Sequence, residues 1–243
     1  MIFPFLSTLK VEKSILKVDM HSHLIPGIDD GAKDIDESLL LLKGLSDAGY
    51  EKVITTPHIM LDSYRNGRDN IMEGLQKLQE AALKRGIDII IEAGAEYYLD
   101  DGFEVHLKRG NLLTLGDNYI LFETSYVAKP LQFEEMVFAI SSAGYQPVLA
   151  HPERYRYIQN NANEYKRMQE LGIIFQVNIN SLGGHYGKDA QKKALFLSKE
   201  GMIGFLGSDI HHYRQIETLI ALQKSKTYQN IFRYNTILND RLF

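Results

Sequence analysis

Short apolar runs alternate along this chain with longer segments whose apolar residues recur at helical spacing. The apolar runs predict seven strands, at residues 17–20, 52–55, 87–93, 119–122, 147–150, 173–177 and 203–206. The helical periods predict helices through residues 35–45, 69–85, 133–143, 162–171, 189–200 and 215–224. Because strands that alternate with helices form parallel sheets, the pattern predicts an α/β fold whose sheet is either open or closed into a barrel.

Glycines mark the ends of several predicted helices, where a left-handed residue is common. They are Gly49, Gly144, Gly172 and Gly201. No linker or low-complexity segment divides the chain, which predicts a single domain over residues 1–243 with residues 1–17 as an N-terminal extension. The continuous apolar run at 87–93 predicts a strand buried on both faces. Residues 60–68 and 97–117 are longer inserts, and their aromatic residues make them candidate substrate loops.

Composition excludes several classes of protein. Hydrophobic residues make up 44% of the chain, the formal net charge is −4, and no basic cluster suggests a nucleic-acid partner. The absence of cysteine excludes disulfides, thiolate zinc sites and phosphatases that use a cysteine nucleophile, and it fits a cytoplasmic location. The N-terminus lacks the features of a signal peptide, and no apolar run reaches the roughly 18 residues of a transmembrane segment. Oligomeric state is left open.

Side chains that bind metals gather where the predicted strands end. They are His21, His23, Asp30, His58, Glu96, Glu123, His151, Asp209 and His211. Because the carboxyl ends of parallel strands open on one side of such a fold, we expect these side chains to converge. A single histidine is more often structural than metal-bound, but six of the eight histidines lie at strand ends. That concentration favours a shared metal site.

The types of ligand narrow the choice of ion. Imidazole and carboxylate groups without thiolates suit manganese, iron or zinc. The four carboxylates in the set contribute a charge of −4. With three divalent ions the net formal charge of ligands and ions is about +2, which suits the binding of a hydroxide and a phosphate monoester. For Glu96 and Glu123 the alternative is a buried ion pair with an arginine.

Two arginines follow the predicted ligands at short spacing. Arg154 stands three residues after His151, and Arg214 stands three residues after His211. A guanidinium group matches the oxygens of a phosphate in bidentate geometry, whereas the alternative role for each arginine is a surface ion pair. Both arginines are therefore candidate phosphate-binding catalytic residues.

These motifs, in this order, resemble the PHP (polymerase and histidinol phosphatase) superfamily. The matching segments are DMHSHLIPGIDDGAKD, TTPH, AGAEYYL, FETS, AHPERY, QVNINSLGG and GSDIHH. Within that superfamily they look most like the bacterial protein-tyrosine phosphatases of capsule and exopolysaccharide gene clusters. The resemblance implies a distorted (β/α)7 TIM-like barrel that holds three divalent ions, with manganese expected and iron or zinc as alternatives.

The resemblance also implies a distribution of the ligands. The first ion would be held by His21, His23, Glu96 and Asp209, the second by Glu96, Glu123 and His151, and the third by Asp30, His58 and His211. Arg154 matches the phosphate-binding arginine of the family. The second arginine of the family usually stands slightly farther from the SD-x-H motif than Arg214 does.

We therefore expect a protein-tyrosine phosphatase that acts through a metal-activated hydroxide. The expected substrate is phosphotyrosine in the tail of a bacterial tyrosine kinase that controls polysaccharide export. His58 and His212 are the candidate general acids. One alternative is a PHP phosphatase for a small ester such as histidinol phosphate, and another is a non-catalytic regulator that binds phosphotyrosine. An amidohydrolase is disfavoured because Glu123 stands where that class usually has lysine.

Overall fold

The computed structural model describes residues 16–159 and 162–243, so most of the N-terminal extension expected at residues 1–17 lies outside the described residues. All strand pairs within the two sheets are parallel, which confirms the predicted α/β class. The smaller sheet has the order β1 (Val18–Asp19), β2 (Lys52–Thr55), β4 (Ile90–Ala93). The larger has the order β3 (His58–Ile59), β5 (Glu96–Tyr98), β6 (Tyr119–Glu123), β7 (Gln146–Ala150), β8 (Ile174–Asn178), β9 (Ile203–Gly207).

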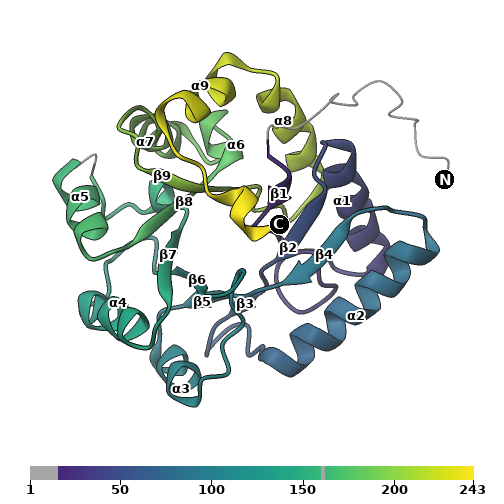
Figure 1. Cartoon of the computed structure of the whole chain (residues 1–243), viewed down its shortest axis with the longest axis horizontal. Coiled ribbons are helices and arrows are strands. Elements are labelled where there is room, and N and C mark those ends of the chain that lie inside the picture. Colours follow the sequence, from purple (N-terminus) through teal and green to yellow (C-terminus); the bar gives the residue numbers. More distant parts are fainter. Residues whose placement is uncertain (1–15, 160–161) are drawn as a thin grey trace.

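Helices lie outside the strands in Figure 1. They are α1 (Ile35–Asp47), α2 (Arg68–Lys84), α3 (Asp101–Arg109), α4 (Phe133–Ser142), α5 (Ala162–Glu170), α6 (Ile179–Leu182), α7 (Lys188–Lys199), α8 (Tyr213–Gln223) and α9 (Lys226–Tyr234). Two 3-10 turns, η1 (Pro152–Arg154) and η2 (Asn239–Leu242), complete the elements of the described chain. The four predicted glycine caps have positive φ angles between 70° and 95°, as expected for residues that end helices.

Side chains on alternate positions of the strands enter two different apolar clusters. In β6, Leu121 belongs to a small cluster with Val148 and Phe205, whereas its neighbours Ile120 and Phe122 belong to the large cluster that includes the helices. Both faces of the central strands are therefore buried, so polar side chains that bind a ligand have room only at the strand ends. A parallel bridge between Ser22 and Ile210 joins the segments that follow β1 and β9.

Two short strands that the sequence did not predict, β3 and β5, follow the predicted strands at 52–55 and 87–93 after short breaks. The break between β2 and β3 contains Pro57, which has no N–H group to donate to a strand partner. The break between β4 and β5 contains Gly94, where an added Cβ would lie 2.5 Å from a methyl carbon of Leu115. Each break places a candidate metal ligand at the start of the strand that follows it: His58 begins β3 and Glu96 begins β5.

The structure differs from the expected local structure in two places. The run at 87–93 is not buried on both faces, since Ile90 is 48% exposed and β4 lies at the edge of the smaller sheet. Only one side of an edge strand is covered by a neighbouring strand, and alternate side chains of β4 face outward. The insert at 97–117 contains a helix that the sequence did not predict, α3, and Tyr97 and Phe103 pack in the core.

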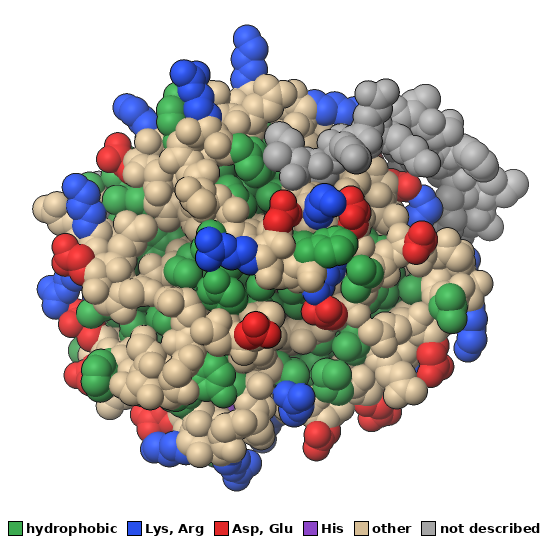
Figure 2. All heavy atoms as spheres, in the orientation of Figure 1, with side chains coloured by type: hydrophobic (Ala, Val, Ile, Leu, Met, Phe, Trp, Pro, Cys, Tyr) green, Lys and Arg blue, Asp and Glu red, His purple; other side chains and the backbone are tan. Residues whose placement is uncertain are grey.

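None of the described helices combines the length and the apolar character needed to cross a bilayer. On the face drawn in Figure 2, acidic and basic side chains are interspersed, and no large patch of either charge is visible.

Candidate metal centre

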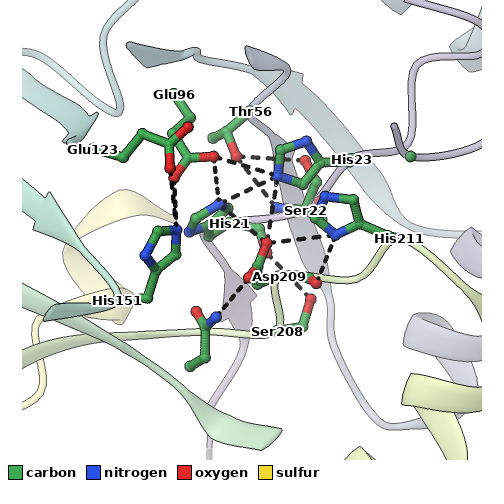
Figure 3. Close-up of polar contacts among 12 residues, drawn as sticks. His21, Ser22, His23, Thr56, Glu96, Glu123, His151, Ser208, Asp209 and His211 are labelled. Atoms are coloured by element: carbon green, nitrogen blue, oxygen red, sulfur yellow. Dashed lines mark hydrogen bonds and ion pairs between the residues drawn. The ribbon is translucent and has the colours of Figure 1, made fainter. Parts of the chain in front are cut away.

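The predicted ligands come together at one side of the strands, and most of them are buried. In Figure 3, His21 and Asp209 lie between a group made of His151, Glu96 and Glu123 and a second group made of His23 and His211. Asp30, in the loop after β1, is the exposed member of the set, with a side chain that is 53% accessible. The sequence therefore identified side chains that the fold brings within a few ångströms of one another.

The innermost part of the cluster joins β1, β5 and β9. The Nε2 atom of His21 lies 3.2 Å from Oε2 of Glu96 and 3.5 Å from Oδ1 of Asp209. The Nε2 atom of His23 lies 3.6 Å and 3.5 Å from the same two oxygens. Two imidazole nitrogens and two carboxylate oxygens thus face one small volume.

A second group surrounds the two glutamates. The Nε2 atom of His151 lies 2.9 Å from Oε1 of Glu96 and 3.9 Å from Oε2 of Glu123. The Nδ1 atom of His58 lies 3.1 Å from each glutamate, yet it forms no hydrogen bond with either. Nδ1 of His151 is likewise buried without a hydrogen-bond partner.

The third group lies nearest to solvent. One oxygen of Asp30 is 3.4 Å from Nε2 of His58 and 3.4 Å from Nε2 of His211. The ring of His211 stacks on that of His23, with 4.0 Å between the ring centroids. His23 therefore lies between this group and the innermost one.

The spacing of these donor atoms fits divalent ions. Ligand atoms that share one ion at about 2.1 Å lie roughly 3–4.2 Å apart. In each of three groups, donor atoms lie within 4.8 Å of one another: His21, His23 and Glu96; His58, Glu96 and Glu123; His23, Asp30, His58 and His211. The set contains the imidazole and carboxylate donors that manganese, iron and zinc accept.

The negative charge of the carboxylates in the cluster also favours bound cations. Burial lowers the pKa of His23, but the charge of Asp29 and hydrogen bonds to Asp209 and Asp29 outweigh it and raise that pKa to about 10. Burial opposes ionisation of Asp209, but the charges of His21 and its other partners hold the pKa of that carboxyl well below its usual value. The carboxylates therefore attract positive charge, and protons and metal ions compete for the same nitrogens.

Two residues that hold the histidines were missed by the sequence analysis. Asp29 accepts a hydrogen bond from Nδ1 of His23 at 2.8 Å, and Gln176 accepts one from Nδ1 of His21 at 2.9 Å. Each contact leaves Nε2 facing the cluster, an arrangement that fixes ring orientation in metal sites. Gln176 could have been found from the sequence, because it stands two residues before Asn178, the polar residue that ends β8, and therefore shares its face of the strand.

The backbone is strained at two of the ligands. His151 has φ 35° and Asp209 has φ 51°, and these are the only residues other than glycine with positive φ in the described chain. Such conformations cost about 1–3 kcal/mol and tend to occur at functional sites. The strain supports a functional role for the turns after β7 and β9.

A cavity of about 390 Å³ opens beside the cluster. Its lining includes Asp30, Arg154, Tyr186, His212 and Arg214. The Nη1 atom of Arg154 donates to Oδ2 of Asp209 at 3.0 Å, so this arginine lies at the cluster. Arg214 and His212 are exposed at the rim.

Aromatic residues of the cavity were only partly anticipated. Tyr126, Tyr186 and His185 line it but were not singled out from the sequence. Of the aromatic residues in the two inserts, Tyr64 stacks on His58 with 5.4 Å between centroids, Tyr97 and Phe103 are core residues, and Tyr98 is half-buried. Tyr126 and Tyr186 come from loops after β6 and α6, which sequence spacing does not bring together.

Comparison with known proteins gives consistent matches. The model of the family described as "Capsular polysaccharide synthesis, CpsB/CapC" matches residues 17–231. The tyrosine-protein phosphatase YwqE of Bacillus subtilis (strain 168) is 31% identical over 213 residues, which cover 85% of this chain and 84% of YwqE. The tyrosine-protein phosphatase CpsB of Streptococcus pneumoniae is 29% identical over 202 residues, which cover 80% of this chain and 83% of CpsB.

Solved structures agree with these matches. A structure from the work on B. subtilis YwqE and S. pneumoniae CpsB, called "unique metal-dependent tyrosine phosphatases", matches with TM-score 0.78 and 28% identity. The match covers 90% of this chain and 96% of the other. A phosphotriesterase homology protein from Escherichia coli matches with TM-score 0.54 and 13% identity over 95% of this chain and 96% of that protein, which shows a shared fold alone.

Proposed function

The chain belongs to the CpsB/CapC family of capsular polysaccharide synthesis, and from that premise we propose that it is a metal-dependent protein-tyrosine phosphatase. One observation carries the proposal: three groups of histidine and carboxylate donors lie against a cavity that also contains Arg154. A phosphate monoester has the size and charge that such a site accepts.

The proposed ligand sets are those that the family resemblance implies, and they overlap with the three groups of donor atoms without matching them residue for residue. We assign His21, His23, Glu96 and Asp209 to one divalent ion, Glu96, Glu123 and His151 to a second, and Asp30, His58 and His211 to a third. Manganese is the proposed metal, with iron and zinc as alternatives. Bound divalent ions supply Lewis acidity toward phosphate oxygens and lower the pKa of water toward neutrality.

The side chains of the cavity have separate roles in this proposal. Arg154 binds the phosphate, because among the described residues its guanidinium has one hydrogen bond, to Asp209, and keeps further N–H groups for a ligand. Arg214 adds a second positive charge at the rim. His212, which lines the cavity, is the proposed proton donor to the leaving phenolate, and His58 is the alternative donor only in a site where it does not bind the third ion.

The substrate proposed is phosphotyrosine in the tail of a bacterial tyrosine kinase that governs capsule or exopolysaccharide synthesis. The description of the family and the names of YwqE, CapC and CpsB support it. Such a kinase uses ATP, so we propose that the phosphatase acts in the cytoplasm. Deletion of the gene should raise the phosphotyrosine content of that kinase.

The fold proposed for the whole chain is one domain with a distorted (β/α)7 barrel. Two features support closure of the strands into a barrel. The bridge between Ser22 and Ile210 joins the segments after the first and last strands, and a small apolar cluster lies between the strands. A single cooperative unfolding transition seen by both far-UV and near-UV circular dichroism would support one domain. Two separated transitions would contradict it.

The activity test compares two substrates with and without metal. With manganese, the protein should hydrolyse p-nitrophenyl phosphate and a phosphotyrosine peptide, and a chelator should abolish both activities. Asp209→Ala should reduce turnover at least about a hundredfold, because it removes a ligand and the partner of Arg154. Turnover that survives complete metal removal, faster hydrolysis of histidinol phosphate, or tight binding of phosphopeptide without turnover would each contradict the proposal.

A further inference from the structure

Tyr186 lies in a short loop between α6 and α7 that folds back over the candidate site. The loop reads GGHYG, and Gly184 and Gly187 have φ angles of 82° and 94°. These left-handed conformations favour glycine and allow the tight turn that brings the tyrosine ring to the cavity. Tyr186 is largely covered, although it comes from a loop.

The ring of Tyr186 contacts the guanidinium group of Arg154. The guanidinium carbon lies 4.3 Å from the centroid of Tyr186 and 4.7 Å from that of Tyr126. Both distances are within the range of cation–π attraction, which grows stronger when the pair is shielded from water. The arginine side chain is 23% exposed, so it reaches the cavity while most of its surface is packed.

The hydroxyl of Tyr186 contacts the partner of that arginine. It donates to Oδ2 of Asp209 at 3.2 Å, and the same oxygen accepts from Nη1 of Arg154 at 3.0 Å. The hydroxyl also accepts from Nε2 of Gln215 at 3.2 Å. The Oε1 atom of Gln215 accepts from the backbone N–H groups of His211 and His212, at 2.8 Å each. Tyr186 thus connects the loop after α6 to the turn after β9.

We propose that Tyr186 is a positioning residue that holds Arg154 in place for the phosphate of the substrate. Its ring supports the guanidinium, and its hydroxyl donates, together with the side-chain amide of Asn178, to Oδ2 of Asp209 on the side of Arg154, while Oδ1 faces the histidines. An arginine that is fixed before binding loses less conformational freedom when a phosphate arrives. This inference rests on the proposed function, because it assumes that Arg154 binds the phosphate.

Binding of inorganic phosphate tests the inference separately from catalysis. Isothermal titration calorimetry would be done on manganese-loaded protein, for the wild type, Tyr186→Leu and Tyr186→Phe. Tyr186→Leu should bind phosphate about tenfold more weakly, because it loses the cation–π contact. Tyr186→Phe retains the ring and should recover most of that affinity, within about threefold of the wild type. Manganese content, measured by mass spectrometry, should be unchanged in both variants.

The double variant decides whether Tyr186 acts through Arg154. In an Arg154→Ala background, Tyr186→Leu should weaken phosphate binding no further. Tyr213→Leu is the matched control, because Tyr213 is a half-buried tyrosine at the start of α8 that packs on the core outside the cavity lining. That control should bind phosphate like the wild type.

Three results would overturn the inference. A loss of affinity in Tyr186→Leu that persists in the Arg154→Ala background would mean that the tyrosine acts on the fold or the metal ligands. Unchanged phosphate affinity with a raised KM for p-nitrophenyl phosphate would mean that the ring contacts the phenyl group of the substrate. If Arg154→Ala binds phosphate as tightly as the wild type, Arg154 does not bind the phosphate and the inference has no basis. Failure of the wild type to hydrolyse phosphotyrosine would instead count against the proposed function.

Discussion

Arg154 binds one of the two carboxylate oxygens of Asp209, and the other oxygen faces the histidines. The pair therefore lies between the histidine cluster and the cavity. Nη1 of Arg154 donates to Oδ2 of Asp209 at 3.0 Å, whereas Oδ1 of the same carboxylate lies 3.5 Å from His21. One oxygen thus faces the histidine cluster and the other faces Arg154 and the cavity. The pair lets a residue proposed to hold metal also set the position of a residue proposed to hold substrate.

Replacement of Arg154 should show what its geometry contributes. Arg154→Lys retains a positive charge but loses the planar set of donors that matches phosphate, so kcat/KM should fall about tenfold to a hundredfold. Arg154→Ala should lose more, because Oδ2 of Asp209 also loses a buried partner. The measurement is hydrolysis of p-nitrophenyl phosphate at saturating manganese. Equal activity of the lysine variant and the wild type would contradict bidentate binding.

Asp29 should affect metal affinity although it is not a predicted ligand. Its carboxylate accepts from Nδ1 of His23 at 2.8 Å, and removal of such a partner typically weakens metal binding about 10- to 100-fold. Asp29→Ala should therefore need more manganese for half-maximal binding, with Asp29→Asn intermediate. Asp117→Ala, at an exposed position, is the control. Wild-type manganese affinity in Asp29→Ala would show that His23 is oriented by other contacts.

The turn around Gly31 should not tolerate a side chain. A Cβ at this position would lie 2.3 Å from the carbonyl oxygen of His23 and 2.4 Å from its Cβ, so the ligand itself would have to move. Gly31→Ala should reduce stability by about 1–3 kcal/mol and also weaken manganese binding. At Gly67 the nearest atom to an added Cβ is 4.0 Å away, which makes Gly67→Ala the control. Urea unfolding and a metal titration check both effects, and a Gly31→Ala protein with wild-type metal affinity would contradict the expectation.

Stability should depend on pH through Asp19. Burial raises the pKa of this carboxyl from 3.8 to about 6, although hydrogen bonds from Ser208 oppose the shift. The folded chain therefore holds the proton more tightly than the unfolded chain. The resulting stabilisation is complete below about pH 4 and is lost as the pH rises through 6.

Asp19→Asn isolates this effect, because the amide resembles the neutral acid. The stability of the wild type relative to Asp19→Asn should fall by roughly 2.5 kcal/mol between pH 4 and pH 7. Urea unfolding at several pH values, with chelator present throughout, measures the difference. A constant difference across this range would mean that Asp19 is ionised in the folded protein at all of these pH values.

The sequence by itself determined the parallel α/β class, the glycine helix ends and the nine candidate ligands. It could do so because each depends on local information: apolar periodicity, a left-handed residue after a helix, and a polar residue at the end of a buried strand. It also indicated Arg154, which stands three positions after His151. The prediction that the run at 87–93 is buried on both faces was wrong, because nothing in its apolar sequence indicates that β4 forms the edge of the smaller sheet.

Only the tertiary structure decided which side chains orient these ligands. Gln176 on β8 contacts His21 after β1, and Tyr186 contacts Arg154 from a different loop. Such contacts join residues far apart in the chain, and their partners are set by how strands and loops pack rather than by spacing. The same is true of the breaks before β3 and β5: Pro57 is visible in the sequence, but the close approach of Leu115 to Gly94 exists only in the folded chain.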